Sequence, residues 1–314
     1  MIAFLGEALI DLIGGIGADG QPCFHYYAGG CALNAATAAA RLDSEVLYVG
    51  KLSADMFGKQ MQEHFRKNSV QVVRELCDVP QNSMIGFAKL NDSGSASYSF
   101  YIDGTTVTSL SSDEILDALE DRDELHYLHV GSVAVALDRS GNEILKALKR
   151  LDPKPFIFFD PNVRPTVIDD FDAYRKRVLS IARLSSMIKL SHEDLSLLFP
   201  GIASEQALDY LMDLGVAHVV LTKGKDGLHW RSQGSLDVHV PAVDNPIVDT
   251  VGAGDTVSGA LLTYLEEHGM GTGDPIDEDH AREALVFAAA AAAVTTGRKG
   301  ADPPRRSEIV IADR

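Results

Sequence analysis

The sequence predicts an α/β fold: a doubly wound, mostly parallel sheet flanked by helices, with a small β lid. Short apolar runs alternate with amphipathic stretches along most of the 314 residues, and this alternation is typical of such a sheet. Two polar segments rich in Gly and Ser interrupt the alternation and predict the lid. At roughly 150 residues per domain, the length fits one large domain with a small addition.

The strands and helices follow in order along the chain. Apolar runs predict buried strands at residues 2–4, 46–49, 125–130, 156–159, 187–190 and 218–222. Amphipathic periodicity predicts helices at residues 33–42, 111–119, 141–151, 174–183 and 206–214. Because such sheets bind ligands beyond the carboxyl ends of their strands, we expect the site just after these strands.

The two interrupting segments show the period-two alternation of hairpins. They cover residues 14–27 and 84–101, and the second has its expected turn near Ser93 and Gly94. We expect inserts at 12–27 and 84–101 to form a lid, and residues 1–11, 28–83 and 102–314 to form the large domain. Ordinary surface hairpins are the alternative interpretation.

Composition excludes several classes of protein. Lys and Arg total 28 against 45 Asp and Glu, a net charge of −17, which disfavours nucleic acid and anionic membranes as partners. The cysteines are Cys23, Cys31 and Cys77, an odd number without a CxxC pair, which indicates a reducing compartment. Acidic residues interrupt the N-terminal apolar run, and the longest apolar stretch is about half a membrane span. We therefore expect a soluble, cytoplasmic protein.

Two motifs are set aside. Gly15, Gly17 and Gly20 have the spacing of a dinucleotide-binding loop, but the residues that follow are not helical, so a turn in a β insert is favoured and the dehydrogenase hypothesis fails. The ten histidines form no HExxH or HxxxH pattern, and we expect no zinc site.

The strongest local signal lies at residues 249–262, DTVGAGDTVSGALL. Its glycines let successive N–H groups point into one small space, and a helix beginning near Asp255 adds its positive end, which favours an anion. Asp255 stands beside that space and can accept a proton from an attacking hydroxyl, as phosphoryl transfer requires. A plain helix N-cap is the alternative role for Asp255.

A second glycine turn precedes the alanine-rich helix. Gly29 and Gly30 allow the hydroxyls of a polyol to approach the backbone, and Asn34 offers both a donor and an acceptor. A tight strand–helix connection explains the same residues, and the spacing leaves both interpretations open.

These segments resemble a known family. Residues 28–58 and 249–262 resemble the two signature segments of the ribokinase-like (PfkB) carbohydrate kinases, and residues 6–11 (GEALID) and 159–164 (FDPNVR) resemble its fructokinase branch. The resemblance implies the ribokinase-like fold, with ATP and Mg²⁺ as cofactors and K⁺ as a further candidate. It implies transfer of the γ-phosphate to a hexose, with fructose giving fructose 6-phosphate. It also implies a sugar and a nucleotide as partners, and a homodimer formed through the β lid.

The resemblance also assigns roles by position. Asp255 matches the catalytic base, and Gly252, Ala253 and Gly254 match the anion hole. Arg164 is expected near the transferring phosphate or the substrate. The matches for sugar binding are Asp11, Gly29, Gly30, Asn34, Phe100 and Asn162. The matches for nucleotide binding are Ser191, Asp194, Thr222, Lys223, Gly224, Gly227 and Ala289. Asp194 is expected to reach the metal through water, and Asp249 begins the loop for a monovalent cation.

Three positions depart from the family pattern. Ser191 and Asp194 stand where the family has Asn and Glu, and Ala289 stands where many relatives have Asn. Ile102 replaces the lid arginine of sugar-acid kinases, so a substrate carboxylate loses its partner. A 2-keto-3-deoxygluconate kinase, or a kinase of another sugar, is therefore the alternative enzyme. A catalytically silent sugar sensor is the non-enzyme alternative, although the base and the glycine cradle are both present.

Overall fold

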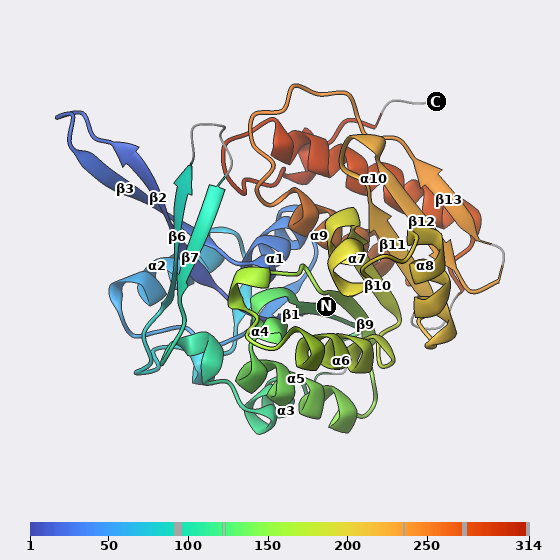
Figure 1. Ribbon diagram of the computed structural model, residues 1–314, viewed down its shortest axis with the longest axis horizontal. Helices are drawn as coiled ribbons and strands as arrows, with labels where there is room; N and C mark the ends of the chain where they lie inside the picture. Colours follow the sequence, from blue (N-terminus) through green and yellow to red (C-terminus); the bar gives the residue numbers. More distant parts are fainter. Residues whose placement is uncertain (91–95, 121, 123, 235, 272–274, 312–314) are drawn as a thin grey trace.

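The computed structural model describes residues 1–90, 96–120, 122, 124–234, 236–271 and 275–311 (Figure 1). Within these residues, a nine-stranded sheet has the order β13-β12-β11-β10-β9-β8-β1-β4-β5. Its strands are β1 (Ile2–Leu5), β4 (Val46–Val49), β5 (Gln71–Val72), β8 (Tyr127–Gly131), β9 (Phe156–Asp160), β10 (Met187–Ser191), β11 (His218–Thr222), β12 (Leu228–Ser232) and β13 (Asp237–Val240).

The pairing confirms the predicted doubly wound, mostly parallel sheet. All pairs from β5 to β11 are parallel, and only β12 and β13 at one edge are antiparallel. The six predicted strands correspond to β1, β4, β8, β9, β10 and β11, and four of these are completely buried. Strands with both faces covered are rich in apolar residues, which is why their sequences were readable as apolar runs.

Helices cover both faces of the large sheet. One core contains residues of α1 (Cys31–Arg41), α2 (Met56–Lys67), α9 (Ala253–Glu267) and α10 (Glu278–Thr296). The other contains residues of α3 (Ser112–Leu119), α4 (Ser132–Ala136), α5 (Asp138–Arg150), α6 (Phe171–Ala182), α7 (His192–Leu198) and α8 (Ser204–Asp213). In Figure 1, α3, α5 and α6 lie below the sheet, and α9 and α10 lie above it.

A second, four-stranded sheet has the order β3-β2-β6-β7 and extends to the left in Figure 1. Its strands are β2 (Leu9–Ile16), β3 (Pro22–Gly29), β6 (Met84–Leu90) and β7 (Ala96–Tyr101). Both expected hairpins are present as antiparallel pairs. The strands of the first extend beyond its predicted insert, to Leu9 and Gly29, whereas those of the second lie within residues 84–101. The turn expected near Ser93 and Gly94 lies outside the described residues.

The glycine motif set aside above lies in the β2–β3 connection. The Gly20 amide donates to the carbonyl of Gly17, and the Gly17 amide donates to that of Gln21. The expected turn is therefore confirmed. Among the described helices, none is both long and apolar enough to cross a membrane.

Candidate active site

The two glycine turns meet because helices α1 and α9 pack closely against each other. At Gly259 of α9, an added Cβ would lie 2.7 Å from the Ala35 carbonyl oxygen of α1. This close approach of the two backbones brings Asn34 and Asp255 together, and Asn34 Nδ2 donates to Asp255 Oδ2 at 2.8 Å. Residues far apart in the sequence therefore share one buried site.

Asp255 lies in the first turn of α9, and its side chain is only 7% exposed. The N-cap interpretation is wrong, because Gly252 is the N-cap and no side chain caps the helix. The helix begins at Ala253, two residues before the expected start. The Asp255 carboxylate instead accepts the bond from Asn34 and a longer one, 3.4 Å, from Asn162 Nδ2.

Burial raises the pKa of Asp255 above the ordinary value of an aspartate. The hydrogen bond from Asn34 acts in the opposite direction, and the charges of Asp160 and Lys189 raise and lower the pKa, respectively. A carboxylate whose pKa is raised toward the working pH is a better general base. The raised pKa is consistent with the expected role of Asp255 as a proton acceptor.

The predicted anion cradle, Gly252, Ala253 and Gly254, forms the amino end of α9. Gly252 has a φ of 77°, a conformation that favours glycine, and a Cβ there would collide with Ala301. The first N–H groups of a helix have no partner within it, so those of Gly254 and Asp255 are available to a ligand. Together with the helix dipole they favour an anion next to Asp255.

The second sheet places Asp11 beside this site. Asp11 of β2 pairs with Tyr27 of β3 and Gly86 of β6, and its carboxylate lies where a Cβ at Gly29 or Gly86 would be. The same Cβ at Gly86 would lie 2.9 Å from the Phe100 ring, so Phe100 also borders Asp11. Burial raises the pKa of Asp11 to about 6, although Arg164 lowers it.

The loop after β9 carries Asn162 and Arg164. Asn162 has a φ of 39°, which is uncommon outside glycine and marks a strained position of the kind found at functional sites. Arg164 is exposed, and its guanidinium donates to the carbonyls of Asn162 and Val163. The loop is fixed by Asp194, which accepts the Val163 amide at 2.7 Å.

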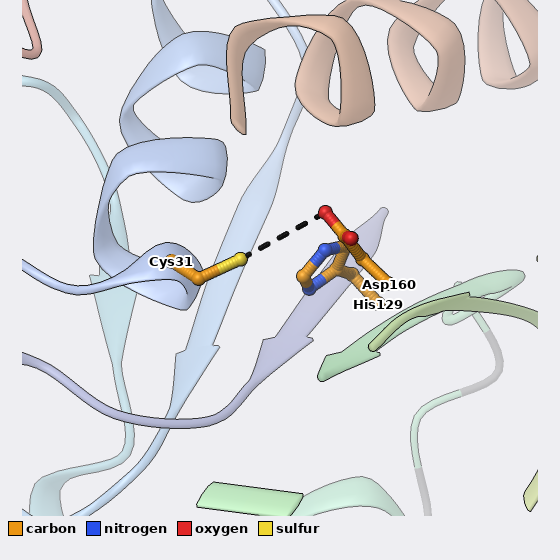
Figure 2. Close-up of side chains that lie close together, drawn as sticks. All are labelled: Cys31, His129 and Asp160. Carbon is orange, nitrogen blue, oxygen red and sulfur yellow. Dashed lines mark hydrogen bonds between the residues drawn. The ribbon is translucent and has the colours of Figure 1, made fainter. Parts of the chain in front are cut away.

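Cys31, His129 and Asp160 lie together beneath the cradle (Figure 2). Cys31 Sγ points at Asp160 Oδ2 from 3.9 Å, and both His129 ring nitrogens lack a hydrogen-bond partner among the described residues. The ligand atoms lie within 4.8 Å of one another, and they are of the types that hold zinc. Sequence reasoning did not find this cluster, because its members come from three distant segments.

Lys189 already provides this cluster with a cation. Its ammonium lies 2.9 Å from Asp160 Oδ2, and both side chains are buried. Burial also raises the pKa of the Cys31 thiol well above its usual range. The ion pair with Lys189 neutralises the charge of Asp160.

A cavity of about 480 Å³ extends from the cradle along α10. Of the predicted nucleotide residues, Thr222, Gly224, Gly227 and Ala289 line it, together with Ala253 and Gly254 of the cradle. Lys223 does not line it, because its ammonium faces His229 at 3.4 Å. The cavity connects a mostly apolar pocket to the anion cradle, which is the arrangement that a nucleobase and its attached phosphates require.

Ser191 and Asp194 also lie outside the lining of that cavity. They form the capping box of α7, in which Asp194 Oδ2 accepts from both the amide and the hydroxyl of Ser191. Asp249 joins two loops instead, accepting the amides of Val251 and Gly300. All three residues organise backbone around the site.

Glu7 and Gly86 are site residues that the sequence reasoning missed. The buried Glu7 carboxylate accepts the amides of Cys31 and Ala134, and so joins the amino ends of α1 and α4. Gly86 provides the space for Asp11. A glycine inside a strand pattern indicates that another group approaches the backbone closely, so Gly86 could have been identified from the sequence. The partners of Glu7 are determined only by the fold.

Four structural features lie together in this region. An anion cradle lies at the end of a nucleotide-sized cavity, a buried carboxylate lies beside the cradle, and a second carboxylate with an arginine lies under the small sheet. This arrangement suits in-line transfer of an anionic group to a hydroxyl.

Comparison with known proteins agrees with this chemistry. A family model described as pfkB family carbohydrate kinase matches residues 1–308. A fructokinase from Rhizobium leguminosarum bv. trifolii is 31% identical over 267 residues, covering 85% of this chain and 80% of that protein.

Two crystal structures are similar along nearly the whole chain. A fructokinase from Vibrio cholerae in its fructose-, ADP- and calcium-bound form has a TM-score of 0.82 and 25% identity, and the match covers 96% of this chain and 94% of that one. An uncharacterized sugar kinase from Pyrococcus horikoshii in complex with ATP has a TM-score of 0.79 and 26% identity, with 98% and 96% covered.

Proposed function

Because the chain belongs to the pfkB family of carbohydrate kinases, and is therefore a phosphotransferase that acts on a sugar hydroxyl, we propose that it transfers the γ-phosphate of ATP to O6 of fructose. The observation that carries this proposal is the bond from Asn34 to Asp255 next to the amino end of α9. It supports a base at Asp255 and an anion cradle beside it, between which a reacting hydroxyl would bind.

The proposed reaction uses the residues in sequence. The O6 hydroxyl of the sugar donates its proton to Asp255 as its oxygen attacks the γ-phosphorus, and ADP leaves as the bond from that phosphorus to the bridging oxygen breaks. The N–H groups at the amino end of α9 stabilise the charge on the transferring group, and Arg164 contributes a positive charge on the sugar side. Asp11, Asn34 and Asn162 hold the remaining hydroxyls of the sugar.

ATP is the proposed donor because the 480 Å³ cavity runs from Ala289 to the cradle. The two solved relatives, one bound to ADP and one in complex with ATP, support a nucleotide as the donor. Because Ala289 is in the lining, its contact with the nucleobase is apolar. Selection of the nucleobase therefore depends on the shape of the cavity.

Magnesium is the metal that the resemblance implies, and the donor groups fit it in one way. Both oxygens of Asp194 already accept hydrogen bonds, from Val163 and from Ser191. Mg²⁺ usually keeps several waters and binds substrate phosphates, so Asp194 fits a contact made through water. When bound, the metal would neutralise charge on the triphosphate. For potassium, we propose the loop that Asp249 joins to Gly300.

A sugar-acid kinase is the second candidate, because Arg164 is the one observation that favours it. Its charge lowers the pKa of Asp11, and it is proposed to meet a substrate carboxylate in the sugar pocket. Ile102 is partly buried against the core and provides no second cation there. A coupled assay with ATP and Mg²⁺ over fructose, glucose, ribose and 2-keto-3-deoxygluconate distinguishes these activities, and no turnover on any sugar supports the silent sensor.

The small sheet is proposed to act as a lid and as the surface of a homodimer. Phe24, Tyr26 and Tyr101 lie on it with more than half of their surface exposed, and exposed aromatics gathered on one sheet favour an interaction surface. Light scattering after gel filtration would give twice the chain mass for a dimer, and F24S/Y26S would reduce that mass to one chain.

A further inference from the structure

A polar layer lies inside the large sheet, directly beneath the anion cradle. His129 of β8, Asp160 of β9 and Lys189 of β10 come from three adjacent parallel strands. They lie on the sheet face that α1 and α9 cover, where the preceding residues of that face, such as Phe158 and Met187, are apolar. Charged residues are almost never fully buried without a partner, so this layer requires a reason.

Helix α9 helps to hold the charged pair of this layer, Asp160 and Lys189, in place. Asp160 Oδ2 accepts from Lys189 Nζ at 2.9 Å and from the Ser258 hydroxyl at 3.0 Å. The same hydroxyl contacts the Gly254 carbonyl at 3.2 Å, so α9 and the pair are joined at the cradle.

Lys189 is oriented toward the cradle. Its ammonium lies 3.5 Å from where a Cβ at Gly254 would be, and Gly254 is the second residue of α9. A charge so deeply buried is weakly screened by solvent and acts over several ångströms. The positive end of the pair therefore faces the place where the anion is expected.

We propose that Lys189, held by Asp160 and Ser258, is a positioning residue that supplies a buried positive charge to the amino end of α9. Its role rests on the proposed function, in which the transferring phosphoryl group binds at that end. The lysine acts through the helix end and Asp255, and Asp160 keeps the ammonium charged and in position.

The groups that face Asp255 divide by element. Cys31 and Asn34 come from α1, Asp11 from β2, Asp160 from β9, Asn162 from the loop after β9, and Lys189 from β10. Lys189 is the cation among these groups, whereas Arg164, whose charge acts on Asp11, is exposed. Lys189 is therefore the cation that water screens least.

A purely structural ion pair makes a different prediction from a charge that serves the cradle. Lys189→Met leaves Asp160 buried and unpaired, which lowers the melting temperature in either case. The double variant D160N/K189M removes both charges, and the side-chain amide that replaces the carboxylate can still accept from Ser258. This variant should recover much of the lost stability, because neutral replacements of buried ion pairs are often well tolerated.

The test measures stability, phosphate binding and turnover for the wild type, K189M, D160N/K189M and a control, R177M. Arg177 is also a buried cation, paired with Asp138, but it comes from α6, on the opposite face of the sheet. Inorganic phosphate that binds the native state raises its melting temperature. This readout does not require the protein to be a kinase.

We expect phosphate to stabilise the wild type and R177M but not D160N/K189M. We also expect D160N/K189M to keep a kcat at least about tenfold below that of the wild type despite its recovered stability. Recovery of both the phosphate effect and kcat in the double variant would overturn the proposal, as would a wild type that phosphate does not stabilise. A wild type that binds phosphate through Lys189 but phosphorylates no sugar would refute the proposed function alone.

Discussion

Asn34 Nδ2 donates to Asp255 Oδ2 at 2.8 Å, joining the first turn of α1 to the first turn of α9. The bond fixes the orientation of the carboxylate and leaves its other oxygen to a weaker contact with Asn162. The amide therefore orients the proposed base and leaves one carboxylate oxygen with capacity to accept a proton.

The first prediction concerns that base. Asp255→Asn removes the proton acceptor, and kcat should fall by about 10²–10⁴-fold, the usual contribution of general-base catalysis. The fold should survive, because Asp255 is not the N-cap and burial of its charge costs stability: its raised pKa destabilises the native state above the unfolded pKa. Kinetics and thermal unfolding together check this. A variant that keeps most of its turnover would show that Asp255 is not the base.

The second prediction concerns pH. The pKa of Asp11 is raised to about 6 from 3.8, so its carboxylate becomes protonated as the pH falls through 6 and loses the charge and one of the two acceptor oxygens that it offers to sugar hydroxyls. KM for fructose should rise below that pH, whereas kcat at saturating fructose should change less. The effect of pH on stability has the opposite sign. A carboxyl group whose pKa is raised in the folded state makes that state less stable at pH values above its pKa in the unfolded chain.

Asp11→Asn provides the comparison. Its KM should be higher but should no longer change around pH 6, and its melting temperature at neutral pH should equal or exceed that of the wild type. A pH dependence of KM that is the same in both proteins would rule out Asp11 as its source.

The third prediction concerns Gly86. In Gly86→Ala the new methyl group would meet Asp11 Oδ1 and the Phe100 ring, both at 2.9 Å, so one of them must move. We expect KM for fructose to rise several-fold, with a smaller effect on KM for ATP. Ser99→Ala, on the neighbouring strand with an exposed side chain, is the control and should leave both constants unchanged. Equal increases in KM for fructose and KM for ATP would indicate a general disturbance of the sheet.

The fourth prediction concerns cations. Activity should be lost in excess chelator and restored by Mg²⁺, because uncompensated triphosphate is disfavoured near a chain of net charge −17. Replacing K⁺ by tetramethylammonium, which is too large for a carbonyl loop, should lower kcat. Full activity in excess chelator would contradict the magnesium requirement.

The large sheet could be predicted because its strands are buried on both faces. Residues 46–49 and 218–222 coincide with β4 and β11, since nothing polar interrupts their apolar runs except at the ends. Strands β12 and β13 were not predicted, because the run LHWRS and its partner at the edge mix charged and apolar residues. Helix α2 was missed for the same reason, with only three buried residues in a polar sequence.

The residues of the candidate site likewise divide into those that could be predicted from the sequence and those that could not. Asp255 and its glycines form one continuous segment, so their chemistry could be read locally. The contacts of Glu7 and the pair of Asp160 and Lys189 depend on packing between distant segments. Even so, Lys189 stood inside a predicted buried strand, and a lysine in such a place was itself a sign that a buried partner had to exist.

The fifth prediction concerns the choice of sugar. Ile102 provides no cation, and a site built to bind hydroxyls discriminates strongly against an analogue that lacks them. Fructose should exceed 2-keto-3-deoxygluconate in kcat/KM by at least about tenfold, a difference of about 1.4 kcal/mol. Ile102→Arg should narrow this gap by giving the carboxylate of the keto acid a partner, while Ile102→Leu should leave it unchanged.

Whether this chain is a fructokinase can be decided by measuring kcat/KM of the wild type for fructose and for 2-keto-3-deoxygluconate, with ATP and Mg²⁺, and by identifying the phosphorylated product. We expect fructose to be preferred and the product to be fructose 6-phosphate. A preference for the keto acid, or a phosphate at another position of fructose, would contradict the proposed function.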